Sequence, residues 1–177
     1  MTCLENLVLL DEAPEHLQAI ETLLDLSFGP GRFAKSSYRL REGVAPLKAL
    51  CAVAELDGEI RGSIRYWPIR LDFDGKKPAL DALLLGPLAV DPALRGQGVG
   101  IALMKDTLER ARKAGHKAVI LVGDEPYYSK LGFSKLAAMG LEMPTPQDPN
   151  RLLGLDLVPG TLDGTPGRIT RALDLAA

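Results

Sequence analysis

The chain has 177 residues, 46% hydrophobic and 25% charged, so it can bury one substantial core but is too short for a second full domain. Its formal net charge of −2 gives no broad basic surface of the kind that binds nucleic acid or an anionic membrane. The composition therefore favours small-molecule chemistry or protein binding.

A first helix is predicted after Pro14, which is a good first-turn residue. Apolar side chains then recur at helical spacing at Leu17, Ile20, Leu24 and Phe28. Gly29-Pro30 ends this segment. A short second helix is predicted from Ser36 to Glu42, with Ser36 or Ser37 as its cap.

Two strands, Leu50 to Leu56 and Ile60 to Leu71, are predicted to form an antiparallel hairpin. Asp57-Gly58 between them tolerates the positive φ that a tight hairpin turn requires. The next apolar run, Ala82 to Val90, is nearly continuous, which is typical of a central strand covered on both faces.

A long helix is predicted from Gly98 to Ala114, with Gly115 as its C-terminal stop. A short strand rich in Val and Ile follows from Lys117 to Val122. Together with the preceding apolar strand, these elements predict a parallel, right-handed βαβ unit.

The last part of the chain is rich in Pro and Gly. A brief helix is expected from Tyr127 to Leu131, and late strands from Leu152 to Val158 and from Arg168 to Leu173. The two cysteines, Cys3 and Cys51, lack a CxxC spacing and are expected to be reduced thiols rather than a disulfide or metal site. With no basic leader and no apolar run of the ~18 residues that a membrane span needs, we expect a soluble, cytoplasmic protein.

A glycine-rich loop between the apolar strand and the long helix is the most informative segment. Its residues are Arg95, Gly96, Gln97, Gly98, Val99 and Gly100. Three glycines let the backbone approach a ligand, and the helix start supplies unpaired amides and a positive dipole end, an arrangement that can hold a diphosphate. The P-loop would need Gly-Lys-Ser or Gly-Lys-Thr, and the GxGxxG fingerprint would need a glycine where Ile101 stands. A purely structural loop is the alternative.

Gly86-Pro87 interrupts the apolar strand just before this loop. Because proline cannot donate to a ladder, the strand must bulge or separate from a neighbour there. The gap would expose the backbone of Leu88, Ala89 and Val90 to an extended ligand that pairs as a pseudo-strand. An edge bulge without a function is the alternative.

The run Leu85-Gly86-Pro87-Leu88-Ala89-Val90-Asp91-Pro92, followed by Arg95-x-x-Gly98-x-Gly100, resembles motif A of the GNAT superfamily of acyl-CoA-dependent N-acyltransferases, and most of all its YhbS-like predicted acetyltransferases. The resemblance implies an α/β (α+β) fold with a mixed sheet, flanked by helices and splayed at a central bulge. It implies a domain over residues 1–140, with strands in 141–177 completing or extending it. The pantetheine arm of acetyl-CoA would pair with Leu88 to Val90, and its pyrophosphate would meet the amides from Gly96 to Ile101, with Arg95 adding charge.

Tyr128 is the candidate general acid. It lies four residues before Gly132-Phe133, and in GNAT enzymes a similar Tyr-x-x-x-Gly-Phe tyrosine points at the CoA sulfur. A phenol with an ordinary pKa near 10 stays protonated at neutral pH and can donate to a departing thiolate. Tyr127 is the rival, and a tyrosine pair that only packs is the alternative.

No general base is evident, because Leu83 to Val90 contains no acid where GNAT members often carry a glutamate. The nearby options in sequence are Asp81, Glu55, Asp57, Asp124 and His116. Each is expected to be a solvated surface residue. Deprotonation of the amine through water is an equal option.

The sequence therefore predicts an N-acetyltransferase that moves an acetyl group from acetyl-CoA to a primary amine of a small molecule, amino acid or peptide. A CoA-binding regulatory module without turnover is the alternative, and a structural scaffold without a cofactor is a third. In similar folds the acceptor is selected by segments that correspond to Phe28 to Val44 and Met139 to Leu157. No metal, nucleic-acid or membrane partner is expected, and a homodimer stays open.

Overall fold

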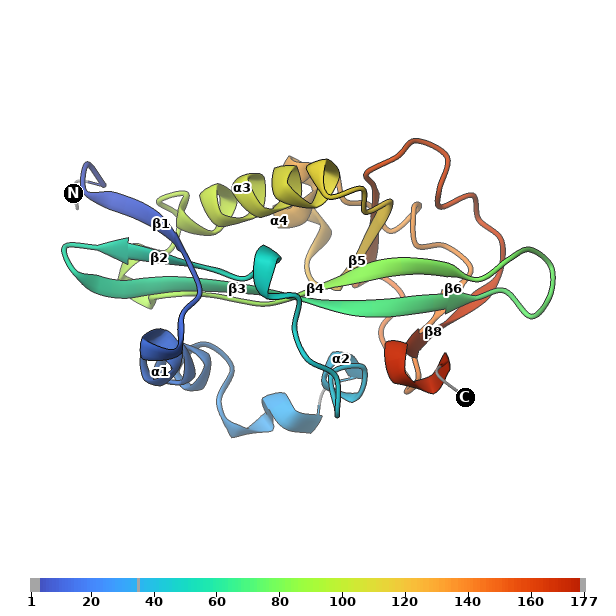
Figure 1. Cartoon of the computed structure of the whole chain (residues 1–177), viewed down its shortest axis with the longest axis horizontal. Helices are drawn as coiled ribbons and strands as arrows, with labels where there is room; N and C mark the ends of the chain where they lie inside the picture. Colours follow the sequence, from blue (N-terminus) through green and yellow to red (C-terminus); the bar gives the residue numbers. More distant parts are fainter. Residues whose placement is uncertain (1–3, 35, 176–177) are drawn as a thin grey trace.

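The computed structural model describes residues 4–34 and 36–175. Within that part of the chain, eight strands form one mixed sheet in the spatial order β1-β2-β3-β4-β5-β7, with β8 beside β3 and β6 beside β8. Helix α3 covers one face of the sheet, and helices α1 and α2 lie against the other (Figure 1). The predicted α/β class, a mixed sheet flanked by helices, is confirmed.

The first four strands form an antiparallel ladder. They are β1 (Leu7–Asp11), β2 (Ala52–Leu56), β3 (Glu59–Asp72) and β4 (Leu80–Val90). The predicted hairpin is confirmed, because Asp57 and Gly58 join β2 to β3 with φ of 53° and 83°. Strand β1 was not predicted, although it pairs with the whole of β2.

The helices of the described residues lie close to their predicted positions. They are α1 (Leu17–Phe28), α2 (Ser36–Arg39), α3 (Val99–Lys113) and α4 (Glu125–Tyr128), with short 3-10 turns at 14–16, 30–34, 48–50, 92–94, 129–131 and 172–175. Helix α1 ends at Gly29, whose φ is 66°. Helix α2 is shorter than predicted, because the chain tightens into a turn in which the backbone amide of Arg41 donates to the carbonyl of Tyr38.

The predicted βαβ unit is present. Strand β5 (Ala118–Val122) runs parallel to β4, with Leu83 opposite Val119 and Leu84 opposite Ile120. Gly115, with φ of 86°, follows the end of the crossover helix α3 as predicted.

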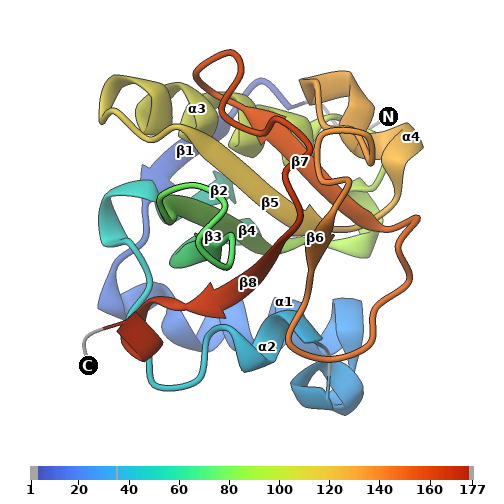
Figure 2. The same cartoon turned by 90° about the vertical axis from the view of Figure 1, so that its right-hand side faces the viewer.

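The late strands gather at one end of the molecule, which Figure 2 turns toward the viewer. They are β6 (Leu141–Glu142), β7 (Leu152–Asp156) and β8 (Gly167–Arg171). Strand β7 pairs with β5 and β8 with β3. Strand β7 ends before the predicted Val158, because the Asp156 carboxylate accepts the amides of Gly160 and Leu162 in a turn.

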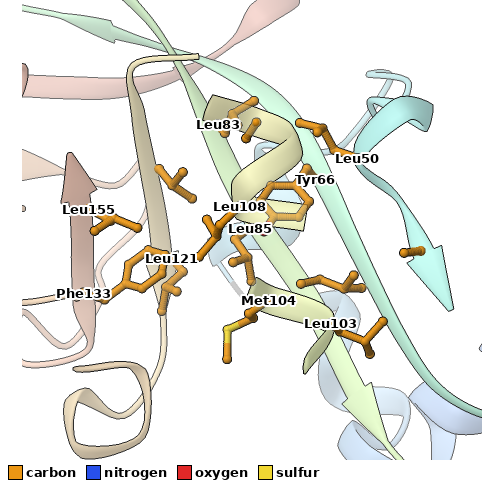
Figure 3. Close-up of a cluster of buried hydrophobic side chains, with 14 of the residues drawn as sticks. Leu50, Tyr66, Leu83, Leu85, Leu103, Met104, Leu108, Leu121, Phe133 and Leu155 are labelled. Atoms are coloured by element: carbon orange, nitrogen blue, oxygen red, sulfur yellow. The ribbon is translucent and has the colours of Figure 1, made fainter. Parts of the chain in front are cut away.

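The largest hydrophobic cluster lies between α3 and the sheet, where Leu103, Met104 and Leu108 pack over Tyr66 and Leu85 (Figure 3). Each fully buried side chain of this size contributes roughly 1.5–3 kcal/mol. The Tyr66 hydroxyl lies 2.9 Å from Oγ1 of Thr107, so the one polar atom of this ring is hydrogen-bonded. This cluster fixes the start of α3 against β4.

Cys51 is buried with a free thiol, as predicted, whereas Cys3 lies outside the described residues. Of the helices in the described part of the chain, none combines the length and apolarity of a bilayer span.

Candidate active site

Strands β4 and β5 separate halfway along β4. In the described structure, β4 pairs with β5 only at Leu83 and Leu84, whereas on its other side β4 stays paired with β3 as far as Val90. The β3 register shifts between Ile64 and Tyr66, opposite Gly86-Pro87, so the predicted bulge is present. Because β4 is a central strand, the separation opens a gap inside the sheet rather than at its edge.

A side-chain hydrogen bond holds the bulge. Nε1 of Trp67 donates to the carbonyl of Gly86 over 2.7 Å. Beyond the bulge the side chains alternate: Ala89 packs with α1, whereas Leu88 and Val90 pack on the α3 side. The backbone of Leu88 to Val90 therefore faces the gap with one edge, as the sequence predicted.

The glycine-rich loop leads from the end of β4 into α3. Gly96 and Gly98 have φ of 78° and 88°, in the left-handed region that favours glycine. Among the described residues we find no acceptor for the backbone amides of Gly96, Gly98, Val99, Gly100 and Ile101. The first helical bond runs from the amide of Ala102 to the carbonyl of Gly98 over 2.9 Å. The start of α3 therefore presents a set of free donors.

Two residues of the loop differ from these glycines. The backbone amide of Gln97 donates to the carbonyl of Leu94 over 3.2 Å, and its side-chain amide donates to the carbonyl of Ala93 over 3.2 Å. Gln97 therefore forms its hydrogen bonds within the loop. The side chain of Arg95 is exposed.

Helix α4 approaches the start of α3 through Tyr127. A Cβ atom at Gly100 would lie 2.3 Å from the Tyr127 hydroxyl, 3.5 Å from Val90 and 3.6 Å from Leu88. Only glycine fits there without displacing Tyr127. The free amides, the open edge of β4 and α4 therefore meet at Gly100.

A cavity of about 800 Å³ lies at the gap in the sheet and is bordered by Leu88 and Tyr127, the neighbours of Gly100. Its walls include Leu85 to Leu88 of β4, Tyr127 and Tyr128 of α4, much of the segment that joins α1 to β2, and Pro146, Gln147 and Arg151. The cavity beside the bulge of β4 suits a long, flexible arm such as that of coenzyme A, and the free amides at the start of α3 suit its phosphates.

Comparison with known proteins identifies the family of the chain. Residues 48–135 match the family described as "Acetyltransferase (GNAT) domain". The uncharacterized N-acetyltransferase YhbS of Escherichia coli is 30% identical over 158 residues, which span 89% of this chain and 92% of that protein. The chain belongs to the GNAT family.

Two solved GNAT structures support the assignment over nearly the whole chain. The crystal structure of E. coli YhbS in complex with CoA has a TM-score of 0.76 and 28% identity, and covers 97% of this chain and 93% of that chain. The structure of a GNAT family acetyltransferase from Brucella melitensis in complex with acetyl-CoA has a TM-score of 0.64 and 25% identity, and covers 93% and 94%. The predicted family and fold are confirmed.

Tyr127 and Tyr128, which precede Gly132-Phe133, both line the cavity. The Tyr128 ring lies on Gly123, where a Cβ would approach it to 2.3 Å, and meets the Phe133 ring edge to face at 6.1 Å between centroids. Burial raises the pKa of Tyr128 to about 12 and also raises the pKa of Tyr127. Both phenols are therefore protonated at neutral pH.

Of the five candidate bases, Asp124 alone lines the cavity, and it forms an ion pair with Arg151 at 3.2 Å. Asp57 accepts a hydrogen bond from Asn6, and Asp81 lies 3.6 Å from Arg70. Glu55 and His116 lie outside the cavity wall. In the described residues we find no group of three or more His, Cys, Asp or Glu side chains placed to hold a metal ion.

Sequence reasoning missed several polar residues of the cavity. The cavity wall includes Glu21, Arg32, Tyr38, Arg41, Arg65 and Trp67. The segment Phe28 to Val44 was expected to contact the acceptor, but no residue in it stood out as polar and buried.

Proposed function

We propose that this GNAT protein transfers an acetyl group from acetyl-CoA to a primary amine of a small molecule, amino acid or peptide. The observation that carries the proposal is the coincidence of two features: β4 leaves β5 after Leu84, and the free amides of α3 begin at the end of the same strand. One feature suits the pantetheine arm and the other suits the pyrophosphate.

The residues present fit coenzyme A. The amides of Gly96, Gly98, Val99, Gly100 and Ile101 would hold the phosphates, with the positive end of the α3 dipole behind them. Arg95, exposed beside them, would add charge, and Gln97 would shape the loop through its internal bonds. The backbone of Leu88, Ala89 and Val90 would pair with the amide-bearing arm.

When bound, acetyl-CoA supplies the thioester carbonyl that the amine attacks, and the sulfur leaves. We assign Tyr128 the role of donating a hydrogen bond to that sulfur. Its pKa of about 12 lies above the value of about 8.5 for a simple thiol, so we narrow the predicted general-acid role to hydrogen-bond donation: the phenol keeps its proton and stabilises the charge. The proton of the product thiol then derives from the amine. Tyr127, whose hydroxyl lies at Gly100, is better placed to contact the arm.

The amine must lose a proton before it attacks, because an alkylamine with a pKa near 10.4 is mostly charged at pH 7. Within the described residues, β4 carries no acid beyond its entrance. In the cavity wall Glu21 and Asp124 are each paired with an arginine, and Glu42 is exposed. We therefore assign this step to water in the cavity rather than to a carboxylate.

Residues 141–177 are proposed to belong to the same domain as residues 1–140. The support is that β7 adds to β5 and β8 adds to β3, so the later strands extend the sheet that carries the site.

The absence of an acid on β4 beyond Asp81 also favours a second candidate, a CoA-binding module without turnover. Calorimetric titration with CoA and acetyl-CoA tests cofactor binding, and failure of both to bind at micromolar protein would sink both candidates. A thiol-release assay over a panel of amines separates them, because only the enzyme releases CoA in an amine-dependent way.

The role of Tyr128 has its own test. Tyr128→Phe should lower kcat by 10- to 1,000-fold while CoA affinity is retained, with Tyr127→Phe as the matched control. If Tyr127→Phe lowers kcat more, the two roles must be exchanged.

A further inference from the structure

The cavity wall holds four arginines, and three of them are already neutralised. These three pairs are Arg32 with Glu21 and Asp25, Arg65 with Glu12, and Arg151 with Asp124. Arg41 is different, because among the described residues it has no acidic partner. Of the acids in the described wall, Glu21 and Asp124 belong to these pairs, and Glu42 is exposed and forms no ion pair with Arg41, so the Arg41 guanidinium is open to an anion from outside.

The guanidinium of Arg41 is mostly buried, and its Nε is a buried donor without a hydrogen-bond partner. Burial lowers its pKa to about 10, so it remains charged at neutral pH. The Trp67 ring, with its centroid 5.8 Å away, offsets only a small part of the cost of burying a charge. An unpaired buried cation beside an open cavity is arranged for an anion that comes from outside the chain.

The position of Arg41 indicates which ligand supplies the anion. A Cβ atom at Gly86 would lie 3.3 Å from Nη2 of Arg41, so the guanidinium lies directly on the bulge. The free amides proposed for the phosphates of CoA lie at the start of α3, on the far side of Leu88 and Val90 from this point. The anion at Arg41 is thus not the pyrophosphate, and it lies beside the place where the arm would end.

We propose that Arg41 binds a carboxylate of the acceptor, so that the acceptors are amines with a carboxylate close to the reacting nitrogen, such as amino acids. This inference rests on the proposed acetyl transfer. A single free guanidinium matches a monoanion in charge, and its planar fork matches a carboxylate in shape. A phosphate dianion would leave one negative charge unmatched, because the other three arginines are occupied.

The test compares amino acids with their carboxamides, which keep the amine and lose only the charge. In the thiol-release assay, the wild-type protein should prefer the acid by roughly 10- to 100-fold in kcat/KM. Arg41→Gln should abolish this preference through a higher KM for the acid. Arg70→Gln, which alters a paired arginine outside the cavity, should keep it.

Each other outcome overturns the inference in a distinct way. An equal loss for acid and amide in Arg41→Gln would mean that Arg41 acts on the thioester rather than on the acceptor. Equal wild-type rates for the amino acid and its carboxamide would overturn the inference. This comparison does not depend on whether Arg41→Gln folds. Acetyl-CoA binding measured in parallel keeps these results apart from failure of the proposed function, in which neither class of amine is acetylated.

Discussion

A methyl group added at Gly100 would report on the contact between α3 and α4. The Cβ of Gly100→Ala would lie 2.3 Å from the Tyr127 hydroxyl, closer than real contacts allow, so either the ring or the helix start must move. Overpacking of this kind costs roughly 1–3 kcal/mol. Replacing glycine by alanine near a helix start recovers up to about 1 kcal/mol of helix propensity. We therefore expect a net loss of about 1–2 kcal/mol in the free energy of unfolding.

Urea denaturation of a double-mutant cycle isolates this contact. Tyr127→Phe removes only the colliding oxygen, so the double variant should regain most of the loss, with a coupling energy of about 1–2 kcal/mol. Gly98→Ala is the matched control. Its Cβ would meet no atom within 4 Å but its φ is 88°, so it should lose about 1–2 kcal/mol through backbone strain, which Tyr127→Phe cannot relieve. If Gly100→Ala is as stable as the wild type, or if both alanine variants are rescued equally, the packing of Tyr127 on Gly100 is refuted.

Three further predictions concern the core and the cavity wall. Tyr66→Phe deletes the buried hydrogen bond to Thr107 and should lower the free energy of unfolding by about 1 kcal/mol in urea denaturation, and an unchanged midpoint would contradict this. Because burial raises the pKa of Tyr128 to about 12, the folded state keeps this phenol proton to higher pH than the unfolded chain. Its share of the stability is complete below about pH 10 and is lost as pH rises towards 12, so thermal melts of Tyr128→Phe should show a shallower alkaline decline than the wild type. Arg65→Leu leaves the Glu12 carboxylate, which Arg65 holds at 2.7 and 2.9 Å, without its partner, and should cost about 3 kcal/mol, whereas a loss below 1 kcal/mol would mean that solvent reaches the pair.

The elements that the sequence predicted are those with a local signal. Helix α1 has helical periodicity, the β2–β3 hairpin has Asp57-Gly58, and α3 has a glycine at each end. Strand β1 has neither strict alternation nor a turn signal, and it is recognisable only through its pairing with β2, more than 40 positions later. Strand β6 has two residues and exists through its pairing with β8.

The same distinction applies to the site. The glycine loop and the Gly86-Pro87 bulge were predictable, because glycine and proline determine the backbone conformation locally, within a few consecutive residues. The charge pattern of the cavity was not, since Glu12 and Arg65 meet across 53 positions. Arg41 stands out only after the partners of the other arginines have been assigned.

The cavity wall is drawn from two sources along the chain. The bulge of β4 and the tyrosines of α4 lie within the matched residues 48–135, whereas Glu21 to Pro46 and Pro146 to Arg151 lie outside that range. Under the proposed function, donor binding and acceptor choice would then fall to separate stretches of polypeptide. If so, exchanging the outer stretches between GNAT proteins should change which amine is accepted while the part that binds acetyl-CoA is preserved.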